Sequence, residues 1–290
     1  MTKFIITSDT GSDLTVQDCA KLDVYLICLK YRVDDEVMQS AMSDRQLKSF
    51  YESMKNGAAV GTSAPNIHDY ISAWTPFLEK GLPILHLALS SGISSACQNA
   101  MHAAELLKED YENAEITVID SLGGSLGQYL LLEKVAKMRK NGATVSECAD
   151  WLLQNRLKVH IMLTTQELTY LYKGGRVSRA GMTVAHALGI MPVMGINSEG
   201  KVCSLDKVRG KPKTFSKMVD RVAELCNYSD NGTLFVAHAA NEPDARLLAE
   251  EISKKCAFQK VEIRQLGPVI GAHAGPGLVT VIFMGAARSV

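Results

Sequence analysis

Residues 84–109 read ILHLALSSGISSACQNAMHAAELLKE and carry the clearest indication of the fold. Residues 84–89 are mostly apolar, which is typical of a buried strand, and residues 95–109 show helical spacing. The polar loop SSGISS at 90–95 joins the two segments. A buried strand that leads through a short loop into a helix is the repeating unit of an α/β fold, so we expect a largely parallel sheet.

The same alternation extends over the first half of the chain. Further buried strands are predicted at 4–7 (FIIT), 24–31 (VYLICLKY) and 116–119 (ITVI). Helical stretches are predicted at 43–55, 66–79, 122–140 and 144–155, and two of them begin with capping boxes, Ser43 with Gln46 and Thr144 with Glu147. We therefore predict an N-terminal α/β domain over residues 1–154, with a mainly parallel sheet flanked by helices.

The second half of the chain has a different pattern. Residues 190–196 and 201–205 read as two strands, and the turn Asn197-Ser198-Glu199-Gly200 joins them as a hairpin. A hairpin beside helical stretches indicates a mixed sheet. We predict an α+β C-terminal domain over residues 155–290, and we expect tight packing between the domains because no Pro/Gly/Ser-rich linker separates them.

The net charge of the 290-residue chain is zero, with 31 basic and 31 acidic side chains. Residues 1–154 contain 13 Lys/Arg and 20 Asp/Glu, a net charge of −7, and residues 155–290 contain 18 and 11, a net charge of +7. A nucleic-acid-binding protein normally carries a basic excess, so we expect no nucleic-acid partner. The basic half is where we expect an anionic partner to bind.

Composition and motifs exclude several other classes of protein. No window approaches the ~18–20 apolar residues of a membrane span, and the N-terminus MTKFIITSDTGSD does not resemble a signal peptide, so we expect a cytoplasmic protein without stable membrane insertion. The seven cysteines include no CxxC pair, which favours reduced thiols. The histidines lack metal-ligand spacing and no nucleotide-binding glycine motif is present, so neither a metal site nor a cofactor is expected.

Three loops of small and polar residues are candidate anion sites: 61–65 (GTSAP), 90–95 (SSGISS) and 267–277 (GPVIGAHAGPG). Hydroxyls and free backbone N–H groups at helix starts bind carboxylates and phosphates. Helix capping by Ser and Thr is the simpler interpretation of each loop alone. Asp9 and Asp13 could form a carboxylate site after the first strand, but helix capping by Ser12 or Asp13 explains most of this pattern. In the third loop, glycines and prolines are expected to hold His273 in a rigid backbone.

Basic residues gather in two stretches of the second half. Lys173-Gly174-Gly175-Arg176 forms a Gly-rich turn, and 201–217 carries six Lys/Arg against Asp206 alone. Such stretches usually form a solvated face. Two of them in one domain raise the expectation of a docking surface for a phosphorylated or acidic partner.

Taken together and in this order, the motifs resemble those of the DegV family, whose characterised members are the fatty-acid-binding B subunits of bacterial fatty acid kinase. The matching segments span almost the entire chain: SDTGSDL at 8–14, TSAP at 62–65, SSGISSACQNA at 90–100, IDS at 119–121, LTYLYKGGRVS at 168–178 and LGPVIGAHAGPG at 266–277. One departure is Ala64, where the family usually has Gln.

The resemblance implies a DegV-like two-domain fold and a lipid-binding subunit without catalytic residues or a cofactor of its own. A long-chain fatty acid would lie in an apolar tunnel, and Thr62, Ser94 and His273 would hold its carboxylate. A separate ATP-dependent kinase subunit would convert the carboxylate to an acyl phosphate for phospholipid synthesis. Arg176 and Arg209 are the positions implied for contact with that kinase.

Physical chemistry agrees with this assignment. Each methylene that leaves water contributes about 0.8 kcal/mol, so the largely aliphatic core expected of a chain with only 6% aromatic residues suits an acyl chain. A buried carboxylate needs donors to offset its desolvation. Two hydroxyls and a His N–H would supply them, and we expect no permanent cation beside this site.

Two alternative functions remain open at this point. Ser94 and His273 could be the nucleophile and base of a hydrolase or acyltransferase, although no G-x-S-x-G motif surrounds Ser94 and no acidic partner of His273 is identifiable. The third possibility is a lipid-sensing regulatory protein.

Overall fold

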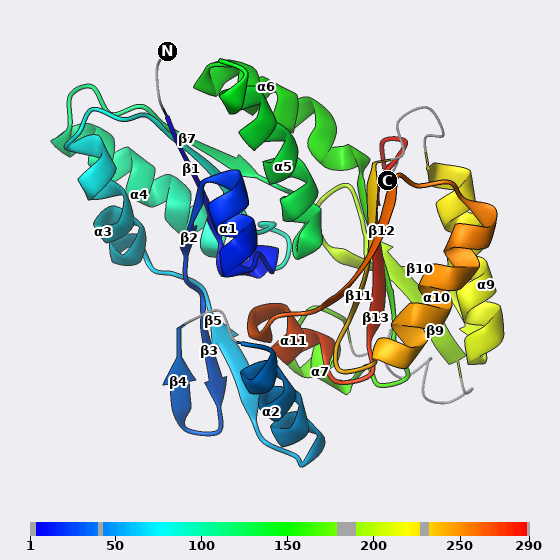
Figure 1. Ribbon diagram of the computed structural model, residues 1–290. Coiled ribbons are helices and arrows are strands. Elements are labelled where there is room, and N and C mark those ends of the chain that lie inside the picture. Colours follow the sequence, from blue (N-terminus) through cyan, green and yellow to red (C-terminus); the bar gives the residue numbers. More distant parts are fainter. Residues whose placement is uncertain (1–3, 40–42, 179–189, 227–231, 289–290) are drawn as a thin grey trace.

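The computed structural model describes residues 4–39, 43–178, 190–226 and 232–288, and its strands form three sheets (Figure 1). A four-stranded sheet belongs to the first half of the chain and a six-stranded sheet to the second. The third, with three strands, lies beside helix α2 (Asp44–Lys55) at the bottom of the view.

The four-stranded sheet has the order β2-β1-β6-β7, and all its neighbouring strands are parallel. Its strands are β1 (Ile5–Asp9), β2 (Val24–Ile27), β6 (Ile84–Ala88) and β7 (Ile116–Asp120). Helices α3 (Ile67–Leu78) and α4 (Ala96–Asp110) pack on one face. Helices α1 (Val16–Leu22), α5 (Leu126–Lys140) and α6 (Val145–Asn155) pack on the other. The predicted parallel α/β arrangement is confirmed, and so are both capping boxes.

The predicted single strand over residues 24–31 is wrong. It is two strands in two sheets: β2 ends at Ile27, and β3 (Lys30–Val33) pairs antiparallel with β4 (Glu36–Met38) and β5 (Val60–Ser63). Between them, Leu29 is 3% exposed, and its N–H donates to Thr10 Oγ1 at 2.9 Å. Both strands bury side chains, so an apolar run does not reveal the point at which the chain changes sheet.

The six-stranded sheet has the order β10-β9-β8-β13-β11-β12 and is mixed, because β11 and β12 are parallel while the other pairs are antiparallel. Its strands are β8 (Val159–Thr164), β9 (Ile190–Ile196), β10 (Val202–Arg209), β11 (Thr233–His238), β12 (Lys260–Gln265) and β13 (Val279–Met284). The predicted hairpin is confirmed as β9–β10. The mixed sheet confirms the α+β prediction for the second half.

The two faces of the mixed sheet pack against different parts of the molecule. Met162, Val236 and Val281 pack against helices α9 (Lys211–Leu225) and α10 (Glu242–Lys255), to the right of the sheet in Figure 1. Residues of opposite side-chain direction, such as Ile161 and Ile282, share a core with the first half of the chain. We propose the domain division at 154/155, between the two sheets.

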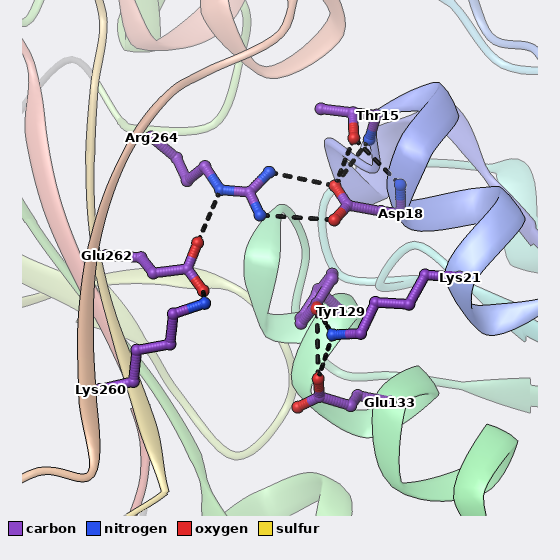
Figure 2. A network of polar contacts seen from close by, with 8 residues as sticks. All are labelled: Thr15, Asp18, Lys21, Tyr129, Glu133, Lys260, Glu262 and Arg264. Atoms are coloured by element: carbon purple, nitrogen blue, oxygen red, sulfur yellow. Dashed lines mark hydrogen bonds and ion pairs between the residues drawn. The ribbon is translucent and has the colours of Figure 1, made fainter.

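An ion-pair network joins the edge strand β12 to helix α1 (Figure 2). Arg264 donates to both carboxylate oxygens of Asp18, at 3.0 and 3.3 Å, and its Nε donates to Glu262 at 3.1 Å. Burial acts to raise the pKa of Asp18, but hydrogen bonds from Arg264 and Thr15 hold it below its ordinary value. The two halves of the chain are therefore packed tightly at this edge, as predicted.

Within the described ranges, no helix combines the length and the apolar character needed to cross a lipid bilayer.

Candidate functional site

A cavity of about 510 Å³ lies between the six-stranded sheet and the loops that follow strands β2 and β6. Its volume falls in the range of roughly 300–1,000 Å³ that is typical of small-molecule sites. Most of its lining is apolar and comes from both halves of the chain: Leu29, Leu89, Ile93, Ile161, Leu163, Ile196, Leu266, Ile270, Leu278 and Ile282. An elongated apolar ligand would be buried against both domains.

Several polar side chains line the cavity, and four of them form what we call the polar cluster: Thr62, Ser94, Arg176 and His273. Thr62 Oγ1 lies 2.6 Å from His273 Nε2, although 211 residues separate them. Arg176 Nη1 lies 3.4 Å from His273 Nδ1. The structure thus brings the three predicted carboxylate-binding residues to the wall of one cavity, together with an arginine.

His273 lies in a short helix, α11 (Pro268–Ala274), and not in the rigid loop that we predicted. Pro268 occupies the first turn, where its missing N–H costs nothing, and Gly275 ends the helix with φ of 76°. Seven residues are too few to show a helical period in the sequence, which explains why the segment reads as a loop.

Thr62 lies on strand β5, opposite Tyr31 of β3. The small antiparallel sheet therefore positions the hydroxyl, and the predicted loop at 61–65 is wrong for Thr62. Ser94 does lie in a loop, ahead of α4, as predicted. Its Oγ accepts a hydrogen bond from the N–H of Ala96 at 3.2 Å.

Gly174 allows His273 to approach the backbone that follows α7 (Thr169–Lys173). A Cβ atom at this position would stand 2.3 Å from His273 Nδ1, which no real contact tolerates. The next residue, Gly175, has φ of 73° and turns the chain so that Arg176 reaches the cavity. The Gly-Gly pair therefore has two different structural roles.

Arg176 contradicts the expectation that no permanent cation lies beside the site. Its Nε and Nη2 donate to the carbonyl oxygen of Ile93 at 3.0 and 2.6 Å, and its Nη1 donates to that of Gly174 at 2.5 Å. Sequence reasoning assigned Arg176 to an outer basic stretch, because neighbours along the chain do not show that its side chain folds back onto His273.

Burial lowers the pKa of His273, and the nearby Arg176 cation acts in the same direction, so that the pKa falls to about 4. The imidazole is therefore neutral at neutral pH. Burial also lowers the pKa of Arg176 from its ordinary value.

The arrangement does not support a serine hydrolase. No hydrogen bond joins Ser94 to His273 in the described part of the chain, and the group beside His273 Nδ1 is a cation. A Ser-His-Asp triad requires a carboxylate in that position.

Arg209 ends strand β10 and is exposed. It does not line the cavity, so the structure separates it from the polar cluster. Over the four described ranges, no group of three or more His, Cys, Asp or Glu side chains could hold a metal ion.

Asp13 is a structural residue of the site that sequence reasoning missed. We interpreted it mainly as a helix cap, yet its carboxylate accepts hydrogen bonds from Ser125 Oγ at 2.5 Å and from the N–H of Gly267 at 3.0 Å. Gly267 is the N-cap of α11, so Asp13 anchors the helix that carries His273. Asp9 does act as a cap, and it accepts hydrogen bonds from Gly11 and Leu89.

Asp13→Asn is expected to stabilise the protein increasingly as pH rises. Burial raises the pKa of Asp13 from 3.8 to about 7, so the native state holds a proton that the unfolded chain has lost. This contribution to stability is complete below about pH 4 and is lost as pH rises through 7. The difference in unfolding free energy between variant and parent should grow by at most about 4 kcal/mol between pH 4 and 8, measured by urea denaturation.

Asp110→Asn, at the exposed end of α4, controls for loss of a surface carboxylate. A difference for Asp13→Asn that stays constant over this pH range would contradict the prediction.

Comparisons with known proteins agree with this fold. Residues 3–286 match a family model described as "Uncharacterised protein, DegV family". A DegV domain-containing protein of Clostridium perfringens is 30% identical over 98% of both chains.

Solved structures share the fold at lower sequence identity. A fatty acid binding DegV family protein of Streptococcus agalactiae superposes with a TM-score of 0.85 at 22% identity, covering 98% of this chain and 99% of that one. The Fatty Acid Kinase B3 protein of Streptococcus pneumoniae, loaded with linoleic acid, gives 0.83 at 22% identity with the same coverage.

Proposed function

Because the chain belongs to the DegV family, we propose that it binds a long-chain fatty acid, with the acyl chain in the apolar cavity and the carboxylate at Thr62, Ser94 and His273. The observation that carries the proposal is the cavity itself, which is mostly apolar and has hydrogen-bond donors gathered in the polar cluster. Two other hydroxyls on its wall already have acceptors: Ser125 donates to Asp13 and Thr280 to the carbonyl of Met162.

The cavity and the polar cluster suit the two ends of a fatty acid. Each buried methylene contributes about 0.8 kcal/mol, so a long chain supplies most of the binding free energy. The carboxylate loses its water and needs several donors in exchange. Both solved relatives support this reading, since one is described as fatty acid binding and the other carries linoleic acid.

The test is to look for lipid that remains bound through purification. Recombinant protein, extracted under denaturing conditions and examined by mass spectrometry, is expected to release about one long-chain fatty acid per chain. Protein that is delipidated and then incubated with a fatty acid should bind it again. Failure to find lipid in the purified protein, combined with failure of the delipidated protein to bind, would refute the proposal.

We further propose that the protein acts in the cytoplasm and presents the carboxylate to an ATP-dependent kinase subunit. A carboxylate oxygen would form a bond to the γ-phosphorus of ATP, and ADP would leave with the bridging oxygen, which yields an acyl phosphate. Arg209 and Arg176 are the proposed docking arginines. Support comes from the basic charge of the second half and from the similarity to a Fatty Acid Kinase B3 protein.

Arg209→Ala is expected to lower the rate of acyl-phosphate formation with the kinase subunit about tenfold or more while the fatty-acid content stays unchanged. Arg209 is exposed and outside the cavity, so its loss should leave fatty-acid binding unchanged. Lys254→Ala, on the exposed face of α10, is the control for loss of a surface cation. If the loaded parent protein forms no acyl phosphate, kinase presentation is wrong, and the lipid-sensing role becomes the better explanation.

A further inference from the structure

The guanidinium of Arg176 is a half-buried cation without a counterion among the described residues. Its hydrogen-bond acceptors are the carbonyl oxygens of Ile93 and Gly174, with the ring nitrogen of His273 nearby. Buried charges in proteins are normally paired with an opposite charge. The wall of the cavity therefore carries a positive charge that no residue in the described ranges neutralises.

Arg176 also determines the tautomer of His273. A guanidinium has donors and no acceptor, so the atom that faces it, Nδ1, must be the unprotonated nitrogen of the neutral ring. The ring proton is then on Nε2, which donates to Thr62 Oγ1 at 2.6 Å. Thr62 already accepts this bond, so its own O–H is directed to another acceptor.

We propose that Arg176 is a positioning residue that makes the site selective for an ionised carboxylate over an uncharged head group of the same chain length. The inference rests on the proposed fatty-acid function. Arg176 acts in two ways: its positive charge attracts the anion, and the tautomer that it sets aligns the donors of His273 and Thr62. An alcohol would bury the same acyl chain but would gain little from either.

The cavity and the polar cluster make separate contributions to affinity. The apolar cavity binds the chain whatever its head group, and the polar cluster distinguishes one head group from another. Loss of the Arg176 charge should therefore change selectivity, and it should leave the affinity for an uncharged ligand nearly the same.

The experiment measures dissociation constants of palmitic acid and hexadecanol for delipidated protein. Arg176→Gln is expected to reduce the preference for the acid by about 10-fold to 100-fold, with hexadecanol affinity almost unchanged. Arg176→Lys, which keeps the charge, should restore part of the preference. Arg246→Gln is the matched control, since it removes an exposed arginine outside the cavity, and it should preserve the parent preference.

Nitrogen-15 NMR of His273 supplies a second measurement. The parent protein is expected to show the neutral ring protonated on Nε2, and Arg176→Gln should shift it towards a mixture of tautomers. An unchanged preference for the acid in Arg176→Gln would overturn the inference. Equal weakening of both ligands would also overturn it, because that pattern indicates a purely structural role.

A third outcome concerns the proposed function. If the parent protein binds neither palmitic acid nor hexadecanol, the fatty-acid function is wrong, and the role of Arg176 is wrong with it. Binding of both ligands with equal affinity by the parent would leave the lipid-binding function in place and overturn only the selectivity.

Discussion

His273→Ala is expected to weaken fatty-acid binding by about 10-fold to 100-fold. The substitution removes the Nε2–H donor that directs the Thr62 hydroxyl towards the carboxylate, and a hydrogen bond to a charged group contributes about 1.5–3 kcal/mol. Each 1.4 kcal/mol corresponds to about a factor of ten in affinity. Thr62→Val should have a similar effect, because Thr62 and His273 are bonded at 2.6 Å and serve the same carboxylate. The measurement is the dissociation constant of palmitic acid for delipidated protein.

Controls separate the hydrogen bonds from packing. Thr62→Ser keeps the hydroxyl and should bind nearly as well as the parent protein, whereas His68→Ala changes an exposed histidine on α3 and should have no effect. The double variant should lose less than the sum of the two single losses, because the two side chains are in direct contact. Fully additive losses, or equal affinities of the Thr62→Ser and Thr62→Val variants, would contradict this account.

Gly174→Ala is expected to lower fatty-acid affinity at least about tenfold, although the residue carries no functional group. The added Cβ would stand 2.3 Å from His273 Nδ1, so the imidazole must move and its bond to Thr62 must break. Loss of that alignment weakens the hydrogen bond to the ligand carboxylate and removes its contribution to the binding free energy. Gly174 has φ of −72°, which alanine adopts readily, so the effect is steric and not a consequence of backbone strain.

Gly175→Ala is the matched control for this prediction. Gly175 has φ of 73° and no atom within 4 Å of an added Cβ. This substitution should lower the unfolding free energy by about 1–2 kcal/mol through backbone strain while leaving His273 in place. Gly174→Ala should therefore show the larger loss of palmitic acid affinity. Gly175→Ala should show the larger loss of stability in thermal unfolding. Equal losses of affinity in both would show that the turn, and not the contact with His273, controls binding.

Local patterns were sufficient to predict much of the fold. The strand, loop and helix at 84–109 lie where the sequence predicts them, as β6, the Ser94 loop and α4. The capping boxes at Ser43 and Thr144 hold because their hydrogen bonds join residues three positions apart. The β9–β10 hairpin is local in the same way. Predictions succeed here because the interactions lie within a few residues of each other.

Predictions failed where one pattern had two structural interpretations. The apolar run at 24–31 is equally compatible with one strand and with two strands in different sheets. The glycine-rich segment around His273 is too short to show that it contains a helix. Thr62, Ser94 and His273 were proposed as one site because of a family resemblance, and nothing in their spacing indicated that they are neighbours.

Sequence periodicity and capping therefore account for the helices, the strands and the class of the fold. The packing of the two halves of the chain accounts for the site, since it brings Thr62 to His273 across 211 residues and Asp13 to Gly267 across 254. Contacts between distant residues depend on how the packed layers meet, which no short-range pattern records. For that reason a residue that reads as part of a basic surface stretch, Arg176, lies with its charge against the ligand cavity.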